Sequence, residues 1–392
     1  MKIGIDATCW WNNRGFGRYT REMLTALFEL ETPHTFTLFV DQPIEDLSRF
    51  SQVQVVQVGA SRPTTEAAVA DSSRSPIDMY RLYRTVAAAP LDIMYFPAVY
   101  SWFPVPQRLP TMLTVMDAIA EHYPKLIFSN WKSRFFWTLK VKLAIRNSQR
   151  ILTLTEASKR EIVEYIGADA SLIDIAGCAP SAQFQRVTDA AAIRRARENA
   201  SLPAEAPIIV YVGGLAPHKN LHGLLDGLEL ASTDPGVAEV HLALVGDFKG
   251  AGFLSNYESL QQRVRSSAAL RDRVHFSGYV SDDDLIALYS SAVAAAMPSY
   301  SEGFGLPAIE AMACGAPVLS STLGSLPEVV GEAGIYFDPF EPDQIAQAII
   351  RMVNDTQHRA ELAAIAVERA PGFTWERAAR RALAHMENML QG

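Results

Sequence analysis

The chain has 392 residues, of which 49% are hydrophobic and 20% are charged, as in ordinary soluble globular proteins. Its formal net charge is −8, which argues against a general nucleic-acid-binding protein. The apolar N-terminal stretch stops at Asp6, and no window has the ~18 apolar residues of a membrane span, so neither a signal peptide nor a transmembrane helix is predicted. Cys9, Cys178 and Cys314 are far apart and lack metal-binding spacing, which indicates reduced thiols in a cytoplasmic protein.

Two series of short apolar segments predict strands. The first comprises residues 2–5, 37–40, 53–58, 93–96, 112–115 and 151–154, and the second comprises residues 208–212, 240–245, 274–276, 293–297, 317–319 and 335–337. Segments with apolar residues three and four positions apart alternate with these strands and predict helices. The alternation predicts an α/β protein with two parallel sheets, each covered by helices.

The predicted strands divide the chain into domains. We place the first domain at residues 1–190 and the second at 200–370. Residues 373–392 predict an amphipathic helix that is capped by Thr374 and must pack on another element. The polar segment 60–76 has no periodicity and is predicted to be a mobile loop.

A glycine-containing loop at residues 12–20 follows the first predicted strand and carries Gly15 and Gly17. A dinucleotide-binding fingerprint would have a third glycine where Thr20 stands, so the pattern does not favour a nicotinamide site. Taken alone, the two glycines are equally well explained by a tight turn.

Two aromatic segments of the first domain are candidate acceptor surfaces. Residues 95–103 include Tyr100 and Trp102, whose rings can stack on a sugar or a lipid; a packed loop is the alternative. Residues 130–150 predict a helix that mixes basic and aromatic side chains. This helix fits an anionic membrane surface, and a solvated face over a buried aromatic face explains it too.

A candidate phosphate site opens the second domain. Gly213 and Gly214 follow a predicted strand, and His218 and Lys219 precede a predicted helix. Ligands of open α/β sheets bind outside the carboxyl ends of the strands, where Lys219 would meet a pyrophosphate. The alternative is a strand-to-helix turn with a surface lysine.

No segment predicts a metal site. The acidic run Asp282–Asp284 follows Ser281, and this order is typical of a capped helix start with a negative first turn. We therefore expect no metal and no other cofactor, and a phosphate would be bound by Lys219, helix N-termini and backbone amides.

Residues 299–318 hold the most specific pattern of the chain. Glu302 and Glu310 are eight positions apart, Pro307 suits the first position of a helix, and Gly315 suits the residue just past its end. The N-terminus of this helix would offer backbone N–H groups to a phosphate. The segment that would supply them is Gly303, Phe304, Gly305 and Leu306.

This pattern resembles the E-x7-E motif of the retaining glycosyltransferases of family 4, which have the GT-B fold. The resemblance extends to the loop at 12–20, to the segment around Asp117, to residues 155–159 and 278–282, and to the Lys219 loop. It implies two Rossmann-like domains that face each other across a cleft, with the C-terminal helix crossing back onto the first. Two residues depart from the family pattern, because Met116 replaces a histidine and His218 replaces an arginine.

The resemblance also implies an activity, the transfer of a hexose from a nucleoside diphosphate sugar with retention and without a metal. The donor would be GDP-mannose or a UDP-hexose, and the acceptor a glycan or lipid-linked glycan of a surface polysaccharide. Lys219 would stabilise the leaving phosphate, Glu302 would contact the sugar, Glu310 would bind the ribose, and Asp117 would position the sugar or acceptor. The glycine loops would line the donor, at Gly15, Gly17, Gly213, Gly214, His218 and residues 303–306.

Three alternatives stay open at this point. The chain fits a GT-B sugar-nucleotide epimerase, and Met116 and His218 fit a non-catalytic GT-B protein that binds a sugar nucleotide. A nicotinamide dehydrogenase is the third. The implied location is cytoplasmic, with peripheral contact at the inner face of the membrane if the basic aromatic helix binds lipid.

Overall fold

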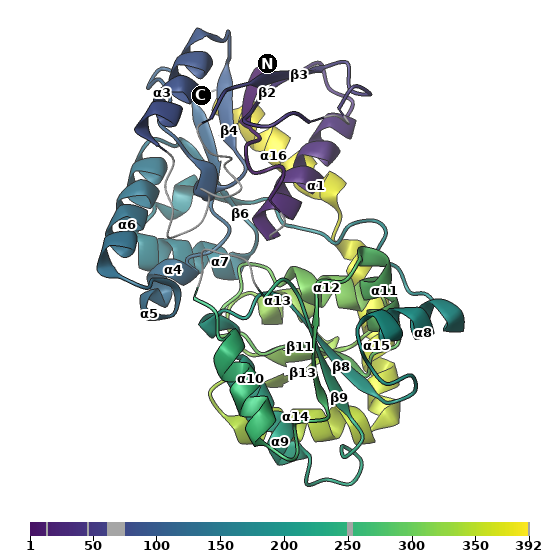
Figure 1. Ribbon diagram of the computed structural model, residues 1–392. Helices are drawn as coiled ribbons and strands as arrows, with labels where there is room; N and C mark the ends of the chain where they lie inside the picture. The colour runs from purple at the N-terminus through teal and green to yellow at the C-terminus, as the bar shows by residue number, and fades with distance from the viewer. Residues whose placement is uncertain (13–14, 45–46, 61–74, 249–253, 391–392) are drawn as a thin grey trace. The chain divides into compact units, whose positions relative to one another are not determined.

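The computed structural model describes residues 1–12, 15–44, 47–60, 75–248 and 254–390 (Figure 1). The chain divides into two compact units, Met1–Cys178 with Thr374–Gly392, and Ala179–Phe373. Most of the predicted mobile loop at 60–76 lies outside the described residues, as do residues 13 and 14 of the first glycine loop.

Within the described residues, the first unit is built on a seven-stranded parallel sheet with the order β3-β2-β1-β4-β5-β6-β7. Its strands are β1 (Lys2–Asp6), β2 (Thr35–Val40), β3 (Val53–Gln57), β4 (Ile93–Phe96), β5 (Thr111–Thr114), β6 (Arg150–Thr153) and β7 (Ile173–Ile175). Its helices are α1 (Gly15–Glu29), α3 (Pro76–Ala88), α4 (Ile119–His122), α5 (Pro124–Ile127), α6 (Trp131–Arg146), α7 (Glu156–Glu161) and α16 (Trp375–Met389). Short helical turns are η1 (Val99–Ser101), η2 (Ile162–Ile166, a π-turn) and η3 (Ala170–Leu172).

The second unit has a six-stranded parallel sheet, again counting only the part of the chain that the structure describes, with the order β10-β9-β8-β11-β12-β13. Its strands are β8 (Ile208–Val212), β9 (His241–Val245), β10 (Val274–Gly278), β11 (Ala294–Met297), β12 (Val318–Ser321) and β13 (Gly334–Phe337). Its helices are α8 (Ala190–Asn199), α9 (Leu221–Ala231), α10 (Tyr257–Ser266), α11 (Asp282–Ser290), α12 (Leu306–Ala313), α13 (Leu326–Val330), α14 (Pro342–Asn354) and α15 (Thr356–Arg369). Two 3-10 turns are η4 (Pro217–Lys219) and η5 (Ala370–Gly372).

The two parallel sheets confirm the fold class predicted from the sequence, and every predicted strand is present. The additional strand β7 was not predicted. Its sequence, Ile-Asp-Ile, is only three residues long and has Asp174 in the middle, so it forms no apolar run at the edge of the sheet.

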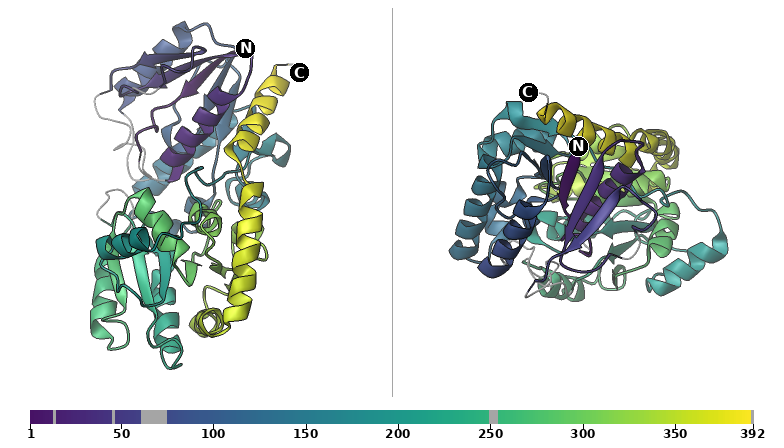
Figure 2. Two further views of the ribbon diagram at one scale, coloured as in Figure 1. Left: turned by 90° about the vertical axis from the view of Figure 1, so that its right-hand side faces the viewer. Right: turned by 90° about the horizontal axis from the view of Figure 1, so that it is seen from above.

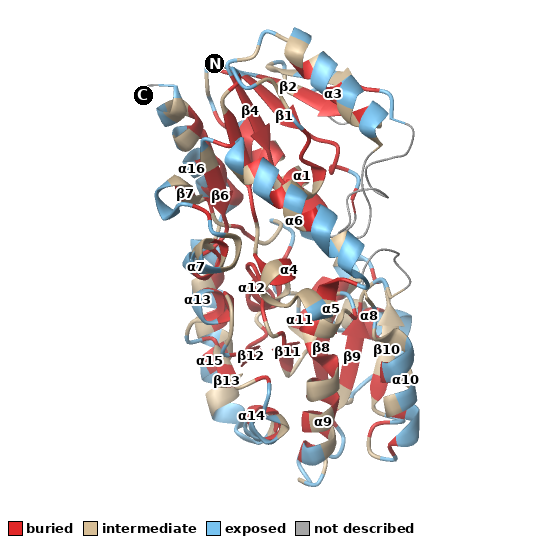
Figure 3. Cartoon of the chain, turned by 90° about the vertical axis from the view of Figure 1, so that its left-hand side faces the viewer, coloured by how far each residue is buried: buried red, intermediate tan, exposed pale blue. Residues whose placement is uncertain are grey.

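The second sheet is buried on both faces, which is the usual reason why parallel strands are apolar throughout. Side chains alternate between two cores along each strand. Ile209 and Tyr211 belong to one core with α9 and α14, whereas Ile208 and Val210 belong to the other with α8 and α11. In Figure 3 the strands are accordingly buried and the helices expose their outer faces.

The C-terminal helix α16 packs against α1 in the first unit (Figure 2). The Thr374 hydroxyl caps it by accepting a hydrogen bond from the Arg377 amide at 3.2 Å, as the sequence predicts. Its buried stripe begins with Trp375, whose ring meets that of Tyr19 edge to face at a centroid distance of 5.6 Å. A hydrogen bond of 2.9 Å joins His34 Nε2 and Glu387 Oε1.

Candidate functional site

The strand order of the second sheet locates a ligand site before any side chain is considered. From β8 the chain winds toward β9 and β10, whereas from β11 it winds toward β12 and β13 in the opposite direction. The adjacent strands β8 and β11 therefore form the topological switch point, outside whose carboxyl ends open α/β sheets bind ligands. The loops that leave these two strands carry Lys219 and Glu302.

The loop after β8 is shaped by glycine and asparagine. Gly213 has a φ of +150°, and a Cβ there would lie 2.9 Å from the Tyr211 hydroxyl, which donates a hydrogen bond to the Gly214 carbonyl at 2.6 Å. Asn220 has a left-handed backbone with φ of 52°, and its side chain caps α9 by accepting from the Gly223 amide at 3.3 Å. The same side chain donates to the Pro339 carbonyl at 2.6 Å. These contacts hold Lys219 at the last position of η4.

The loop after β11 ends in helix α12, which begins at Leu306. Pro307 is thus the second helical residue rather than the predicted first, and its missing N–H costs nothing at either position. Gly305 precedes the helix with a φ of +88°, where a Cβ would lie 2.7 Å from Leu326 Cδ2. Gly315 has a φ of +84° and ends the helix as predicted, since its amide donates to the Met312 carbonyl at 2.9 Å.

Lys219 and Glu302 form a partly buried ion pair between the two loops. The Lys219 ammonium lies 2.7 Å from Oε1 and 2.8 Å from Oε2 of Glu302. The Ser299 hydroxyl donates to Oε1 at 2.6 Å, and the Tyr300 amide donates to the His218 carbonyl at 2.9 Å. Glu302 is 8% exposed, and its main-chain carbonyl accepts a 2.7 Å hydrogen bond from the Ser325 hydroxyl.

Burial disfavours the charged form of both titratable side chains beside Lys219, but only one of them becomes neutral. For Glu302 burial opposes ionisation, but the Lys219 charge and the hydrogen bonds from Lys219 and Ser299 lower the pKa on balance, so the carboxylate is ionised. Burial lowers the pKa of His218 to about 3, and the Lys219 ammonium adds to this effect. His218 is therefore neutral at physiological pH, and Lys219 supplies the positive charge of this loop.

Glu310 lies in the fifth position of α12 and is 2% exposed. Burial, with a smaller contribution from the nearby Glu310 charge, raises the pKa of the Cys314 thiol to about 12. The Phe304 side chain is packed edge to face on Phe373 at 5.7 Å, so only its backbone is available to a ligand. Helix α12 has no side-chain cap at its N-terminus, in contrast to α9 and α11.

Sequence reasoning missed several residues of this site. Ser299 and Ser325 orient Glu302, and Tyr300 stacks on Phe340 with ring centroids 4.8 Å apart and 57% of Phe340 exposed. Ser299 is close enough in sequence to Glu302 to have been suspected. Ser325 and Phe340 come from later loops, and no local pattern connects them to the site.

The switch point of the first sheet lies between β1 and β4, and it gathers most of the candidate residues of that unit. A Cβ on Gly17 would lie 2.0 Å from the Asn12 carbonyl oxygen, so only glycine fits there, whereas Gly15 has open space. Phe16 stacks on Tyr100 with a centroid distance of 4.7 Å. Met116 packs against the same small cluster as Tyr100.

The aromatic loop after β4 is packed rather than open. Trp102 is 6% exposed, and Tyr100 is held between Phe16 and Trp137, with centroid distances of 4.7 and 5.1 Å. This arrangement favours the packed-loop alternative for Trp102, because its ring has no open face for an acceptor.

Asp117 lies two residues before α4, and its Oδ1 accepts a hydrogen bond from the Ile119 amide at 3.1 Å. One turn later Glu121 is half-buried and accepts a 2.8 Å hydrogen bond from the Trp137 indole. Burial raises the pKa of Glu121 to about 7, against the effect of that hydrogen bond, and the Asp117 charge contributes to the rise. His122 is stacked between Tyr123 and Tyr165, with both centroid distances 4.0 Å.

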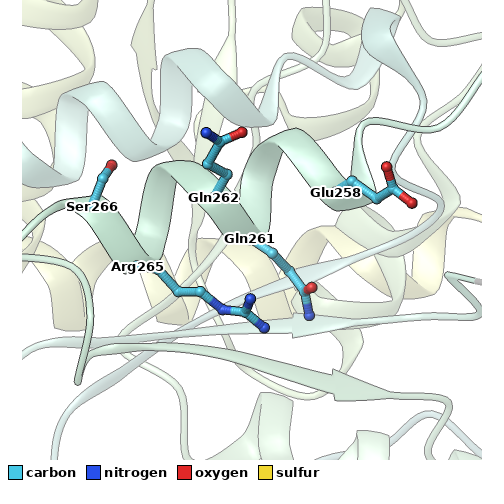
Figure 4. Close-up of a pocket in the computed structure, with 5 residues that line it drawn as sticks. All are labelled: Glu258, Gln261, Gln262, Arg265 and Ser266. Atoms are coloured by element: carbon cyan, nitrogen blue, oxygen red, sulfur yellow. The ribbon is translucent and has the colours of Figure 1, made fainter.

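Other candidate features contribute nothing to this site. The acidic run forms the first turn of α11, where the Ser281 hydroxyl accepts from the Asp284 amide at 3.1 Å as predicted. Among the described residues, no three His, Cys, Asp or Glu side chains are grouped to hold a metal, and no helix is long and apolar enough to cross a bilayer. An open hollow on α10 is lined by side chains of that helix alone (Figure 4): Glu258, Gln261, Gln262, Arg265 and Ser266.

Solved structures place both units in one fold class. The chain matches sucrose-phosphate synthase from Thermosynechococcus elongatus with a TM-score of 0.75 at 20% identity, covering 100% of this chain and 99% of that one. It matches Anabaena HepE in complex with UDP and glucose with a TM-score of 0.72 at 18% identity, covering 99% and 100%. At these identities the likeness shows the fold alone, and that fold is GT-B.

Sequence comparison identifies the second unit more closely. Residues 192–369 match the model of the family described as Glycosyl transferases group 1. The chain is 29% identical over 378 residues to O-antigen chain mannosyltransferase B of Escherichia coli, covering 92% of this chain and 93% of that protein. It is 34% identical over 240 residues to D-inositol 3-phosphate glycosyltransferase of Rhodococcus jostii, covering 60% of this chain and 51% of that protein. The family domain and the mannosyltransferase relatives indicate a hexosyltransferase.

Proposed function

We propose that the chain is a retaining, metal-independent glycosyltransferase of the family 4 type that uses a nucleoside diphosphate sugar as donor. The observation that carries the proposal is the Lys219–Glu302 pair, which joins the loops leaving β8 and β11 at the switch point of the second sheet. One cation, one carboxylate and an uncapped helix N-terminus suit a ligand that carries both phosphates and sugar hydroxyls.

The two side chains of the ion pair are assigned to different parts of the donor. An ammonium group has three N–H donors, and two of them bond to the Glu302 oxygens. We assign the third to a phosphate oxygen of the donor, where it stabilises the charge that grows as the sugar–phosphate bond breaks. Glu302, oriented by Ser299 and Lys219, then offers its remaining acceptor capacity to a sugar hydroxyl.

Two further residues complete the proposed donor site. Glu310 lies on α12 behind the loop and is assigned to the ribose hydroxyls. Replacement of Glu310 by Ala is then expected to weaken donor binding, and unchanged affinity in calorimetry would remove this role. The amides of residues 303–306 are assigned to the pyrophosphate, since α12 has no side-chain cap.

The substrates are proposed from the relatives and from the sequence pattern. Relatives named as mannosyltransferases support mannose as the transferred sugar, so the proposed donor is GDP-mannose, with a UDP-hexose as the second choice. The acceptor is proposed to be a glycan or lipid-linked glycan of a surface polysaccharide, bound by the first unit with Asp117 as a positioning residue. We further propose a cytoplasmic location with peripheral contact at the inner face of a membrane.

Two observations favour a second candidate, a non-catalytic protein that binds a sugar nucleotide. His218 is neutral where the family pattern has an arginine, and Met116 packs in an apolar cluster where it has a histidine. In this case donor binding would persist without transfer.

A thermal-shift screen of nucleotide sugars tests the donor assignment. A donor at one hundred times its dissociation constant stabilises the folded state by about 2.7 kcal/mol, which raises the melting temperature measurably. Stabilisation by one nucleoside diphosphate sugar, but not by NAD or NADP, is expected. NMR of the product then shows whether the anomeric configuration is retained, and a product formed without any acceptor would indicate the epimerase alternative.

A further inference from the structure

Helix α6 exposes an unusual amount of apolar side-chain surface. Single exposed apolar residues are normal on any protein, but here five lie on one helix of 16 residues. Their exposed fractions are 73% for Trp131, 63% for Phe136, 56% for Phe135, 45% for Leu139 and 40% for Leu143. The helix is held to the first unit by a different stripe, Trp137, Val141 and Ala144.

The exposed face of α6 is also basic. The helix contains five basic residues and no Asp or Glu, although the whole chain has a net charge of −8. At 100° per residue, Lys132, Lys142 and Arg146 fall among the exposed apolar side chains, and all three are themselves exposed. Lys132 lies in the first turn, where a positive charge opposes the helix dipole, so helix stability does not account for it.

A second helix of the first unit has the same character. Helix α3 exposes 64% of Ile77 and 61% of Tyr80, and Arg84 lies over the Tyr80 ring at 6.0 Å. In both Figure 1 and Figure 3, α3 and α6 lie on the same side of the first sheet. Apolar and basic side chains are therefore mixed on two helices that cover one face of this unit.

The inner side of α6 is joined to the loops that carry the acceptor candidates. The Trp137 indole donates to Glu121 at 2.8 Å, one turn after Asp117, and the Lys140 ammonium donates to the Tyr100 carbonyl. Tyr100 in turn stacks on Phe16. Whatever binds the outer face of α6 is thereby brought close to these loops.

We propose that the exposed face of α6 binds the surface of an anionic lipid bilayer. Trp131, Phe135 and Phe136 enter the headgroup region, and the basic side chains between them pair with anionic headgroups. A helix with exposed aromatic and basic residues on its outer face and no acidic residue matches this environment better than it matches an acidic protein surface, which would not require three exposed aromatic rings. The inference rests on the proposed function in one respect: binding of α6 to the bilayer would bring a lipid-linked acceptor close to the Tyr100 and Asp117 loops.

Vesicle co-sedimentation of the full chain tests the proposal. Phosphatidylcholine vesicles with and without phosphatidylglycerol are compared, and binding is expected only when the anionic lipid is present. Each basic side chain near an anionic surface contributes about fivefold to the partition coefficient. Reversal of two charges in the double variant Lys132→Glu, Lys142→Glu should therefore lower binding by at least about 25-fold, and high salt should do the same to the wild type.

Matched variants separate the α6 face from general surface effects. Phe135→Ser with Phe136→Ser is expected to abolish binding, whereas Leu230→Ser with Val367→Ser removes exposed apolar side chains from the second unit and should bind like the wild type. Arg195→Glu with Arg271→Glu is the charge control. Brominated lipids should quench Trp131 fluorescence, and Trp131→Phe should remove that part of the quenching.

The outcomes decide between lipid and other partners. Failure of the wild type to bind anionic vesicles, or equal losses in the α6 and control variants, overturns the proposal and leaves an acidic protein as the partner of α6. Thermal stabilisation by the nucleotide sugar is measured on the same variants and should be unchanged. If nucleotide sugars do not stabilise the wild type, the proposed function is refuted. The vesicle-binding result is independent of that outcome and tests the lipid proposal by itself.

Discussion

Replacement of Lys219 by Met tests the ion pair at the centre of the proposed site. The substitution keeps the length of the side chain and removes its charge, so Glu302 loses two hydrogen bonds and its counter-ion and keeps the hydroxyl of Ser299. Breaking a buried ion pair by removing one partner costs about 3–5 kcal/mol because the other charge is left uncompensated.

Two features of the structure lower the expected loss of stability. The Lys219 side chain is 22% exposed, so water screens part of the interaction, and Ser299 still bonds to the carboxylate. We therefore expect a loss of about 2–3 kcal/mol, which for a unit of this size lowers the melting temperature by roughly 5–10 °C. Turnover should fall by about one to three orders of magnitude, as expected for one lost transition-state contact.

The wild type and Lys219→Met should differ in how their free energies of unfolding change with pH. In the wild type the folded pKa of Glu302 is lowered below its ordinary value of 4.5, so its stabilising effect is complete above that value and is lost as the pH falls through the folded pKa. In Lys219→Met the carboxyl is buried without its cation, its folded pKa rises above the ordinary value, and stability should fall as the pH rises above it. The two proteins should thus differ most near neutral pH and least in acid.

The double variant Lys219→Met, Glu302→Gln is the control, since it removes both charges. It should regain most of the stability and none of the turnover. The reasoning is refuted if Lys219→Met is as stable as the wild type at neutral pH, or if its deficit does not shrink in acid. Melting of the second unit must be followed separately, because the two units can unfold in separate transitions.

Three further predictions follow from the structure. Gly17→Ala places a Cβ 2.0 Å from the Asn12 carbonyl oxygen and should destabilise the first unit by about 2–3 kcal/mol or more in denaturant titrations. Gly15→Ala, where a Cβ meets open space, should change stability by less than about 1 kcal/mol. Equal effects of the two substitutions would contradict the close approach at Gly17. Desolvation raises the pKa of Glu121 from its ordinary value of 4.5 to about 7. The first unit should therefore lose stability as the pH rises through this range, by about 3 kcal/mol in all, and Glu121→Gln should flatten that dependence in melting curves. Treatment with EDTA should leave transferase activity within about twofold of the untreated enzyme, since Lys219 and backbone amides are assigned to the phosphates; a large loss that Mg²⁺ or Mn²⁺ restores would show that a metal takes part.

Local patterns in the sequence determined the elements of this fold. Apolar runs of three to six residues predicted the strands, and Ser281 and Thr374 predicted helix starts that the structure confirms with hydrogen bonds. Gly315 predicted the end of α12, because a left-handed residue is needed there whatever surrounds the helix. These features depend on neighbours within about one helical turn, so the sequence alone was sufficient to find them.

Contacts between distant residues were decided only by the tertiary structure. Lys219 and Glu302 are 83 positions apart, and nothing in either loop shows that the two charges meet or that Ser325 orients the carboxylate. The neutrality of His218, the burial of Trp102 and the raised pKa of Glu121 likewise depend on which groups pack around them. Desolvation and charge pairing are set by the three-dimensional surroundings of a side chain, and a linear sequence specifies those surroundings only after the chain has folded.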